Sequence, residues 1–166
     1  MKLQLIKHRD ILFRDLLRAI AIKNFAWSHS VESQLKWIVD NIDDSDIHVF
    51  LRDGDKDVAY MNLVETSFIV NDTEYLAYGV GNVCALEKGK GYGRELMQQV
   101  NQYLEQKLRA GLLFCRSALV PFYSQFGWEE VKRDVCEIDS LPKDVHVLTY
   151  LVLEKILTLS YSGKLF

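Results

Sequence analysis

Residues 88–94 combine glycine and positive charge in a way that suits the binding of an anion. The segment reads Lys88-Gly89-Lys90-Gly91-Tyr92-Gly93, here called the glycine turn, and Arg94 follows it. Glycine loses more conformational freedom on folding than other residues, so three glycines within five positions require a reason. Glycine also permits φ > 0, which lets successive backbone N–H groups face an anion. A helical apolar pattern starts directly after the turn, and the start of a helix attracts phosphate.

Two familiar phosphate motifs do not match the glycine turn. A P-loop needs four residues between its glycines and then Gly-Lys-Ser/Thr, and a GxGxxG fingerprint counted from Gly89 would need glycine at Arg94. The remaining pattern is a basic residue, two residues, Gly91, one residue and Gly93. Taken alone, this spacing is equally compatible with an exposed turn that carries ordinary surface lysines, so the rest of the chain has to decide.

Length and composition limit the classes of protein to consider. The chain has 166 residues, of which 49% are apolar. This favours one domain with a packed core. The net charge of −3 argues against a general nucleic-acid binder. The positive charge of the glycine turn is therefore local, which indicates a small anionic ligand.

Cysteine usage and apolar runs indicate the compartment. The three cysteines (Cys84, Cys115 and Cys136) form no CxxC pair, so neither a disulfide framework nor a zinc or other metal site is expected. No apolar run approaches the length that spans a membrane, and the N-terminus lacks the apolar core of a signal peptide. We expect a cytoplasmic protein with no membrane partner.

The elements that must position the turn follow from apolar periodicity. Helices are expected from residue 11 to about 25, after Ser30 as N-cap, from about Arg94 to 108, and over 117–126, with Pro121 in the early turns and Gly127 past the end. Strands are expected at 3–6, 47–52, 58–70, 75–86, 111–116, 128–131 and 145–153. This order predicts a single α/β domain over 1–166 with a mixed, mostly antiparallel central sheet flanked by helices on both faces.

A second motif, ALVPFYSQFGWEEV at residues 118–131, supplies the context for the turn. Together the two motifs resemble the GNAT superfamily of acetyl-CoA-dependent N-acetyltransferases. In that family a [QR]xxGx[GA] turn between the fourth strand and the third helix holds the CoA pyrophosphate, and an FYxxxG[FW] segment carries a tyrosine near the CoA sulfur. The second motif here runs from Phe122 through Tyr123 to Gly127 and Trp128. Lys88 stands where the family usually has glutamine or arginine, and it keeps the charge without the forked donor geometry.

The resemblance implies a role for each candidate residue. The amine of an acceptor attacks the thioester carbonyl of acetyl-CoA, and Tyr123 assists the leaving thiolate at least through a hydrogen bond. One N–H group, from Val83 or Cys84, is expected to donate to the developing oxyanion. The residues implied in binding CoA are Val83, Cys84, Ala85, Leu86, Lys88, Gly89, Lys90, Gly91, Tyr92, Gly93 and Arg94, with Ser117 as a further contact to the pantetheine arm.

The residue that deprotonates the amine is left open by the sequence. Glu65, His29, His48 and a water oriented by Asn82 are the alternatives. The Cys84 thiol has no base beside it in sequence, so a route through an acetylated cysteine is not expected.

The acceptor amine is also left open. Phe25, Trp27 and His29 at the junction of the first two helices would suit an aromatic or apolar amine. Six aspartates between residues 43 and 57 would instead suit a polyamine or an aminoglycoside.

The leading interpretation is an N-acetyltransferase that acts directly on a primary amine of a small molecule or a protein. The alternatives are a non-catalytic acyl-CoA-binding sensor or regulatory module and a nucleotide-phosphate-binding domain of another class. Gly79 and Gly81 would either leave room for a ligand or relieve crowding in the core. Residues 154–166 are either a tail or an element that packs on a second copy of the chain in a homodimer.

Overall fold

The computed structural model describes residues 1–166, which divide into two compact units. Unit 1 contains Met1–Val64 and Gly81–Val100, and unit 2 contains Glu65–Val80 and Asn101–Phe166. Three elements pass from one unit to the other without interruption: β3 (Lys56–Val70), β4 (Thr73–Ala85) and α3 (Tyr92–Lys107). None of the helices is long and apolar enough to cross a membrane.

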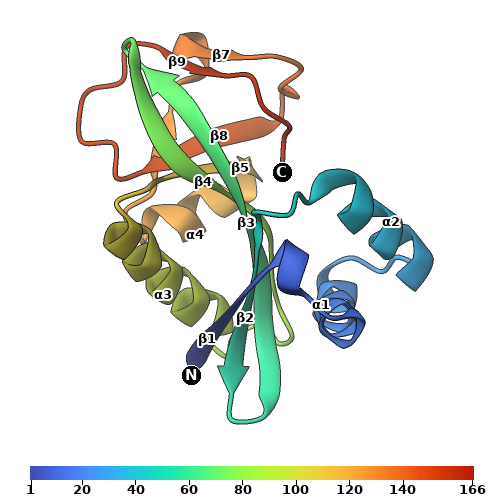
Figure 1. The fold of residues 1–166 in the computed structure, drawn as a ribbon. Coiled ribbons are helices and arrows are strands. Elements are labelled where there is room, and N and C mark those ends of the chain that lie inside the picture. Colours follow the sequence, from blue (N-terminus) through green and yellow to red (C-terminus); the bar gives the residue numbers. More distant parts are fainter. The chain divides into compact units, whose positions relative to one another are not determined.

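In unit 1, β1 (Lys2–Lys7) lies antiparallel to β2 (Ile47–Asp53), and β2 lies antiparallel to β3 (Figure 1). The β2–β3 hairpin closes at Gly54, which has a φ of 58°. Glycine adopts this left-handed region at little cost. All three strands were expected, because each is a β-rich run bounded by turn residues.

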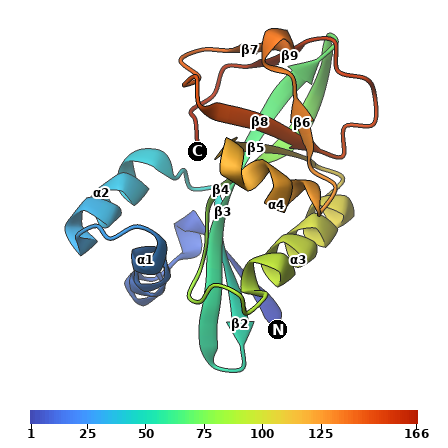
Figure 2. The same cartoon turned by 180° about the vertical axis from the view of Figure 1, so that it is seen from behind.

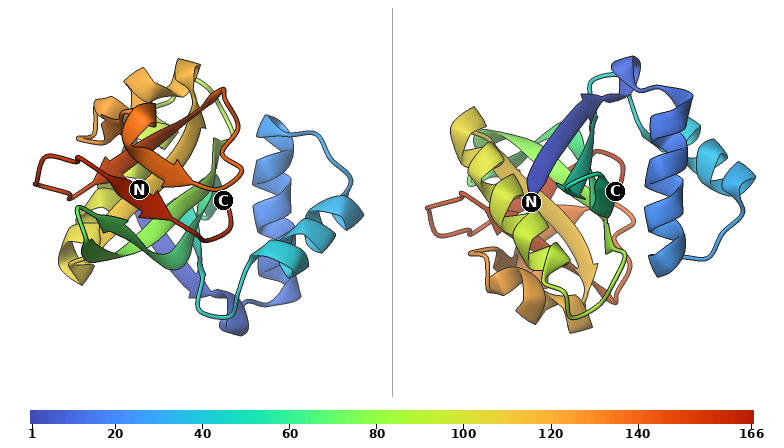
Figure 3. Two further views of the ribbon diagram at one scale, coloured as in Figure 1. Left: turned by 90° about the horizontal axis from the view of Figure 1, so that it is seen from above. Right: turned by 90° about the horizontal axis from the view of Figure 1, so that it is seen from below.

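Two helices lie entirely in unit 1, and Figure 3 shows them next to each other in blue and cyan. They are α1 (Phe13–Ala26) and α2 (Val31–Asn41), and the short 3-10 helix η1 (His8–Asp10) precedes them. The Oγ of Ser30 accepts a hydrogen bond from the Ser33 N–H at 3.1 Å, which confirms the predicted N-cap. The two helices meet through a buried apolar cluster that contains Ile20, Ile38 and Ile42.

Helix α3 starts at Tyr92, two residues earlier than the apolar pattern indicated. The predicted stripe is buried at Leu96, Val100 and Leu104, each with no exposed surface. Leu108 is 89% exposed because the helix has ended and its φ is 51°.

In unit 2, β4 pairs in parallel with β5 (Ala110–Arg116). The antiparallel strands β8 (Val145–Tyr150) and β6 (Glu129–Val131) continue the sheet from β5. Between β5 and β6, the 3-10 helix η2 (Ser117–Leu119) leads into α4 (Val120–Ser124), which Figure 2 shows in orange. The expected helix over 117–126 is thus divided, with Pro121 in its first turn and Gly127 at φ 79° after its end.

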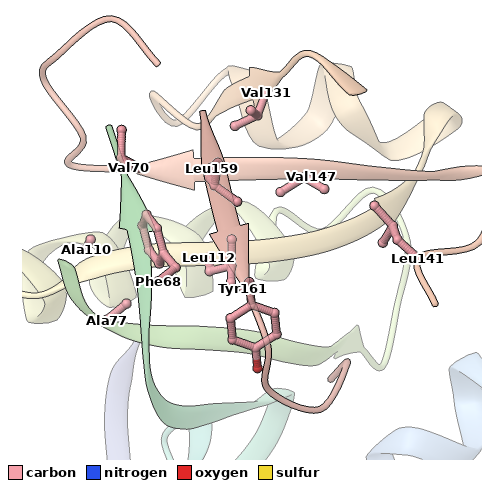
Figure 4. Packing of buried hydrophobic residues seen from close by; sticks show 10 residues of the cluster. All are labelled: Phe68, Val70, Ala77, Ala110, Leu112, Val131, Leu141, Val147, Leu159 and Tyr161. Carbon is pink, nitrogen blue, oxygen red and sulfur yellow. The ribbon is translucent and has the colours of Figure 1, made fainter. Parts of the chain in front are cut away.

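Two short strands of unit 2 were not expected from the sequence. After η3 (Arg133–Val135), β7 (Cys136–Ile138) pairs in parallel with β9 (Leu159–Tyr161), and β9 also pairs antiparallel with β3 at Ile69 and Val70. Leu159 is fully buried, and both Leu159 and Tyr161 belong to the apolar cluster in Figure 4.

The position of the C-terminal residues corrects one of the two alternatives considered for 154–166. They are not a free tail, because Leu159 and Tyr161 are buried in the core of unit 2 and β9 pairs with β3. The sheet is mixed and mostly antiparallel, with parallel pairing of β4 with β5 and of β7 with β9, and this confirms the predicted α/β class.

Candidate active site

The glycine turn follows β4 in unit 1 and has the backbone conformation that its composition suggested. Gly89 has a φ of 79° and Gly91 a φ of 77°. Other residues adopt this region only with strain. A Cβ atom built on either glycine would meet nothing within 4 Å, so the side of the turn where it would lie is open. Lys88 and Lys90 are exposed, and Glu87 is the acidic residue beside them.

The start of α3 contributes further donors to the same turn. The Glu95 N–H donates to the Gly91 carbonyl at 3.0 Å, which begins the hydrogen-bond pattern of the helix. The first N–H groups of a helix, here from Tyr92 and Gly93, have no acceptor within the helix. The helix dipole adds partial positive charge there, and the exposed Arg94 adds a full one. The arrangement fits a pyrophosphate, which needs several N–H donors and a net positive field.

The end of β4 leads into the turn and lies in unit 1 with it. Asn82 has a φ of 54°, which locally interrupts the regular strand. This conformation is uncommon outside glycine. Val83 and Ala85 are half-buried. The Leu86 N–H donates to the Val58 carbonyl at 3.0 Å, and its half-buried side chain packs against the core cluster that contains Tyr60 and Cys84.

Cys84 is a core residue. Its side chain is 6% exposed, and its Sγ lies 3.7 Å from the Tyr60 carbonyl. Burial raises the pKa of the thiol to about 12, so the thiolate needed for nucleophilic attack is scarce near neutral pH. A role of Cys84 in CoA binding would therefore use its backbone.

Ser117 and Tyr123 lie in unit 2, at the start of η2 and within α4. Ser117 is exposed, whereas Tyr123 is 5% exposed and contacts the Phe122 ring edge-on. The end of the FYxxxGW motif is anchored by Trp128, whose Nε1 donates to Asn101 Oδ1 at 3.0 Å. Trp128 fills the space above Gly111, where an added Cβ would lie 2.4 Å from the indole. Tyr123 is thus carried by a segment with a fixed end.

Comparison with known proteins identifies the family. A model of the acetyltransferase (GNAT) domain matches residues 9–131. The chain belongs to the GNAT acetyltransferase family. Membership implies an acyl-CoA as donor. A search among curated proteins found no match.

Solved structures agree with this assignment at the level of the fold. The Escherichia coli protein ElaA shares 17% identity, with 90% of this chain and 98% of that chain covered and a TM-score of 0.64. An acyl-CoA N-acyltransferase from Pseudomonas aeruginosa shares 15%, with 90% and 97% covered and a TM-score of 0.62. The ribosomal-protein-S18-alanine N-acetyltransferase from Escherichia coli shares 16%, with 98% and 97% covered and a TM-score of 0.61.

A pocket of about 310 Å³ lies in unit 1 of this GNAT domain, between α1, α2 and the end of β4. Trp27 and His29 line it, as the sequence suggested for an acceptor site, whereas Phe25 is 69% exposed and does not. Asn82 also lines the pocket and directly precedes Val83, the expected oxyanion donor. This pocket and the end of β4 are therefore adjacent within one unit.

Sequence reasoning missed four residues of the pocket: Lys23, Ser33, Gln34 and Trp37. Lys23 could have been noticed, because it continues the apolar stripe of α1 that contains Leu16 and Ile20. A lysine at a core position of an amphipathic helix is unusual. Gln34 and Trp37 carry no comparable signal.

A chain of buried hydrogen bonds runs from the pocket of the acetyltransferase through unit 1. Asn82 Nδ2 donates to Asn62 Oδ1 at 2.9 Å, and Asn62 Nδ2 donates to the Tyr60 hydroxyl at 2.8 Å. The Tyr60 oxygen lies 2.6 Å from His48 Nδ1, and His48 Nε2 lies 2.9 Å from His8 Nδ1. Because Asn62 donates to Tyr60, the phenol proton goes to His48 Nδ1, and His48 carries its own proton on Nε2.

This network of hydrogen bonds excludes His48 as the base that deprotonates an acceptor. Its side chain is fully buried, and both ring nitrogens already have partners. Burial, reinforced by His8 and Lys23, lowers the pKa of His48 to about 3, so the ring is neutral. His48 instead fixes the position of Tyr60 and, through Asn62, of Asn82.

The other sequence candidates lie elsewhere. Glu65 belongs to unit 2, where a carboxylate oxygen lies 3.9 Å from the Arg109 guanidinium. In the aspartate cluster, Asp57 accepts hydrogen bonds from Arg18 at 2.6 Å and Asp46 caps the Asp43 N–H at 2.8 Å. Neither of these two aspartates lines the pocket.

Gly79 serves packing rather than the approach of a ligand. A Cβ atom at this position would lie 2.2 Å from the ring of Phe166. The C-terminal residue of the chain therefore occupies the space that the missing side chain leaves, within unit 2.

Proposed function

We propose that this GNAT-family acetyltransferase transfers the acetyl group of acetyl-CoA directly to the primary amine of an acceptor. The observation that carries the proposal is the open glycine turn, with two left-handed glycines at the start of α3. It lies in the same unit as the end of β4 and the pocket lined by Asn82. A donor site and an acceptor site are thus joined by the strand residues 82–85.

In this proposal, the glycine turn and Arg94 hold the pyrophosphate of CoA, and residues 83–86 and Ser117 contact the pantetheine arm. Bound acetyl-CoA supplies the thioester that is the acyl donor. The N–H of Val83 or Cys84 donates to the oxygen that becomes negative when the amine attacks. The C–S bond then breaks, and the sulfur leaves as a thiolate.

Tyr123 is proposed to donate a hydrogen bond to that thiolate. A phenol with a pKa near 10 does not fully protonate a thiolate of pKa near 8.5 in water, so the hydrogen bond is the minimum contribution. The burial of Tyr123 supports the role, because a hydrogen bond strengthens where water is excluded.

The acceptor amine must lose a proton, and two groups of the pocket support this step. An alkylammonium has a pKa near 10.4, so deprotonation at pH 7 costs about 4–5 kcal/mol. His29 lines the pocket and is exposed, so it can pass a proton to solvent. Asn82, held by Asn62, can orient a water for the same purpose.

Calorimetric titration with acetyl-CoA, with ATP and NAD as controls, tests the donor site. Selective binding of acetyl-CoA by the wild type is expected. Gly91→Asp should weaken binding at least about 100-fold, or about 2.7 kcal/mol. The reason is that it adds negative charge and a side chain at φ 77°. Gly54→Asp is the matched control, since Gly54 also has positive φ and open surroundings but lies in the β2–β3 turn. Equal loss in both variants, or none in Gly91→Asp, would contradict the assignment.

Turnover of Tyr123→Phe separates catalysis from the alternative of a non-catalytic acyl-CoA sensor. The variant should keep its affinity for acetyl-CoA and lose about 100-fold in kcat, the usual scale for removing a proton donor. Release of free CoA thiol measures the rate. A wild type that binds acetyl-CoA but acetylates no amine in a broad panel would favour the sensor. A cytoplasmic setting belongs to the same proposal, and the three free cysteines are consistent with it.

A further inference from the structure

The pocket in unit 1 contains the side chain of Lys23, which forms no ion pair with a carboxylate of the protein. Lys23 is 5% exposed, and its Nζ lies 4.6 Å from the centroid of the Trp37 ring. That ring is its one close partner, because no hydrogen bond or ion pair reaches the ammonium. Buried charges in proteins are normally paired, and burial accordingly lowers the pKa of Lys23. An anion that entered the pocket would supply the missing partner.

The same pocket contains a buried acceptor without a donor. Gln34 is 4% exposed, and its Oε1 has no hydrogen-bond partner. The orientation of its amide is fixed, because Nε2 donates to Asn24 Oδ1 at 2.5 Å. A buried acceptor without a donor destabilises a protein, so a ligand with an N–H donor would be favoured there.

Asn82 adds a second acceptor at the side of the pocket next to Val83. One N–H of its Nδ2 donates to Asn62 Oδ1, which leaves its carbonyl oxygen and its second N–H for a ligand. The site thus presents one cation and two amide oxygens, with the indoles of Trp27 and Trp37 as apolar walls.

A small amine that also carries a carboxylate matches these groups. We propose that the acceptor is a free amino acid, with its carboxylate on Lys23, its amine on Gln34 and Asn82, and its side chain against Trp27 and Trp37. The volume of about 310 Å³ is at the lower end for ligand sites, which also favours a small acceptor. No acidic residue lines the pocket, so the additional ammonium groups of a polyamine or aminoglycoside would be unpaired there. That the bound amino acid is acetylated rests on the proposed function, whereas its binding in the pocket does not.

The test compares amino acids with their carboxamides, which keep the amine and side chain and remove the negative charge. The wild type should acetylate its preferred amino acid with a kcat/KM at least 10-fold above that of the carboxamide. Lys23→Met should abolish this preference, mainly through KM, and leave the affinity for acetyl-CoA unchanged. Methionine suits a buried apolar position, so the variant should fold. Lys36→Met, on an exposed lysine of α2 paired with Asp40, is the matched control and should change nothing.

Two outcomes would overturn the inference. One is a wild type that prefers carboxamides or polyamines. The other is a Lys23→Met variant that loses kcat equally for amino acid and carboxamide, since that would make Lys23 a general base. Calorimetric binding of the amino acids to wild type and Lys23→Met is measured separately. If no amine is acetylated but the amino acid binds and Lys23→Met abolishes that binding, the proposed function fails while this inference stands.

Discussion

At the residue scale, the most constrained groups of the acetyltransferase are the polar side chains buried inside unit 1. His48, Tyr60 and Asn62 are each at most 1% exposed, and they satisfy one another through a directed chain of hydrogen bonds. Burial raises the pKa of Tyr60, so this phenol stays protonated and keeps the chain in one direction. The hydrogen bonds end at Asn82, so a buried network holds the amide of Asn82 in place at the pocket.

His48 makes the stability of the protein depend on pH. Its pKa is lowered from 6.5 to about 3 in the folded state, so the unfolded chain binds the proton more readily. The contribution of His48 to the free energy of unfolding should therefore be fully present above the pKa of the unfolded state, 6.5. It should fall as the pH drops toward the pKa of the folded state, with a loss of about 2 kcal/mol at about pH 5. Urea unfolding at neutral pH and at about pH 5 measures the loss.

Two variants test whether His48 causes this pH dependence of stability: His48→Gln and, as the control, His29→Gln. The decline in unfolding free energy between the two pH values should shrink in His48→Gln and persist in His29→Gln, because His29 is exposed. A decline of wild-type size in His48→Gln would show that other groups cause it.

At the element scale, the strand β9 has 3 residues and joins two other strands of unit 2. It pairs with both β3 and β7, and Leu159 is packed in the cluster around Phe68 and Val70. Beyond it, Phe166 covers Gly79. Leu159, Tyr161 and Phe166 thus contribute to the core of unit 2, and their removal would expose apolar surface.

Leu159→Ala should lower the free energy of unfolding by about 2–5 kcal/mol, because it leaves a cavity in a buried site. Leu153→Ala is the control from the same C-terminal region, since Leu153 is 96% exposed whereas Leu159 has no exposed surface. The control should change stability by no more than about 0.5 kcal/mol, as is usual for surface positions. Chemical unfolding of both variants gives the comparison. Similar values for the two leucines would mean that β9 contributes little.

At the scale of the whole molecule, the division into two units cuts through β3, β4 and α3 rather than through linkers. Domain boundaries normally fall in exposed, flexible segments. We therefore propose that the chain is a single folding domain over residues 1–166, because neither unit can unfold without disrupting elements that the other shares.

Differential scanning calorimetry tests this proposal. One transition is expected, with the calorimetric enthalpy equal to the van't Hoff enthalpy. Two resolved transitions, or a van't Hoff enthalpy well below the calorimetric value, would show that the units unfold independently. An excess of acetyl-CoA at about 100 times its Kd should stabilise the folded chain by about 2.7 kcal/mol, and the same scan would report the rise in Tm.

The sequence by itself determined the features that depend on neighbouring residues. Apolar periodicity predicted the major helices and strands, Ser30 marked the start of α2, and Pro121 and Gly127 marked the ends of α4. The glycine turn was recognisable because a left-handed backbone at positions 89 and 91 needs glycine whatever surrounds it.

Tertiary structure alone decided the groupings of residues that are distant in the chain. His48 meets Tyr60 and His8 across 12 and 40 positions, and Lys23 meets Trp37 from another helix. The pairing of β9 likewise depends on β3, far earlier in the chain, and a strand of 3 residues is too short to show a period. Local patterns encode the conformation of a segment, whereas burial and charge pairing are set by whichever segments the fold brings beside it.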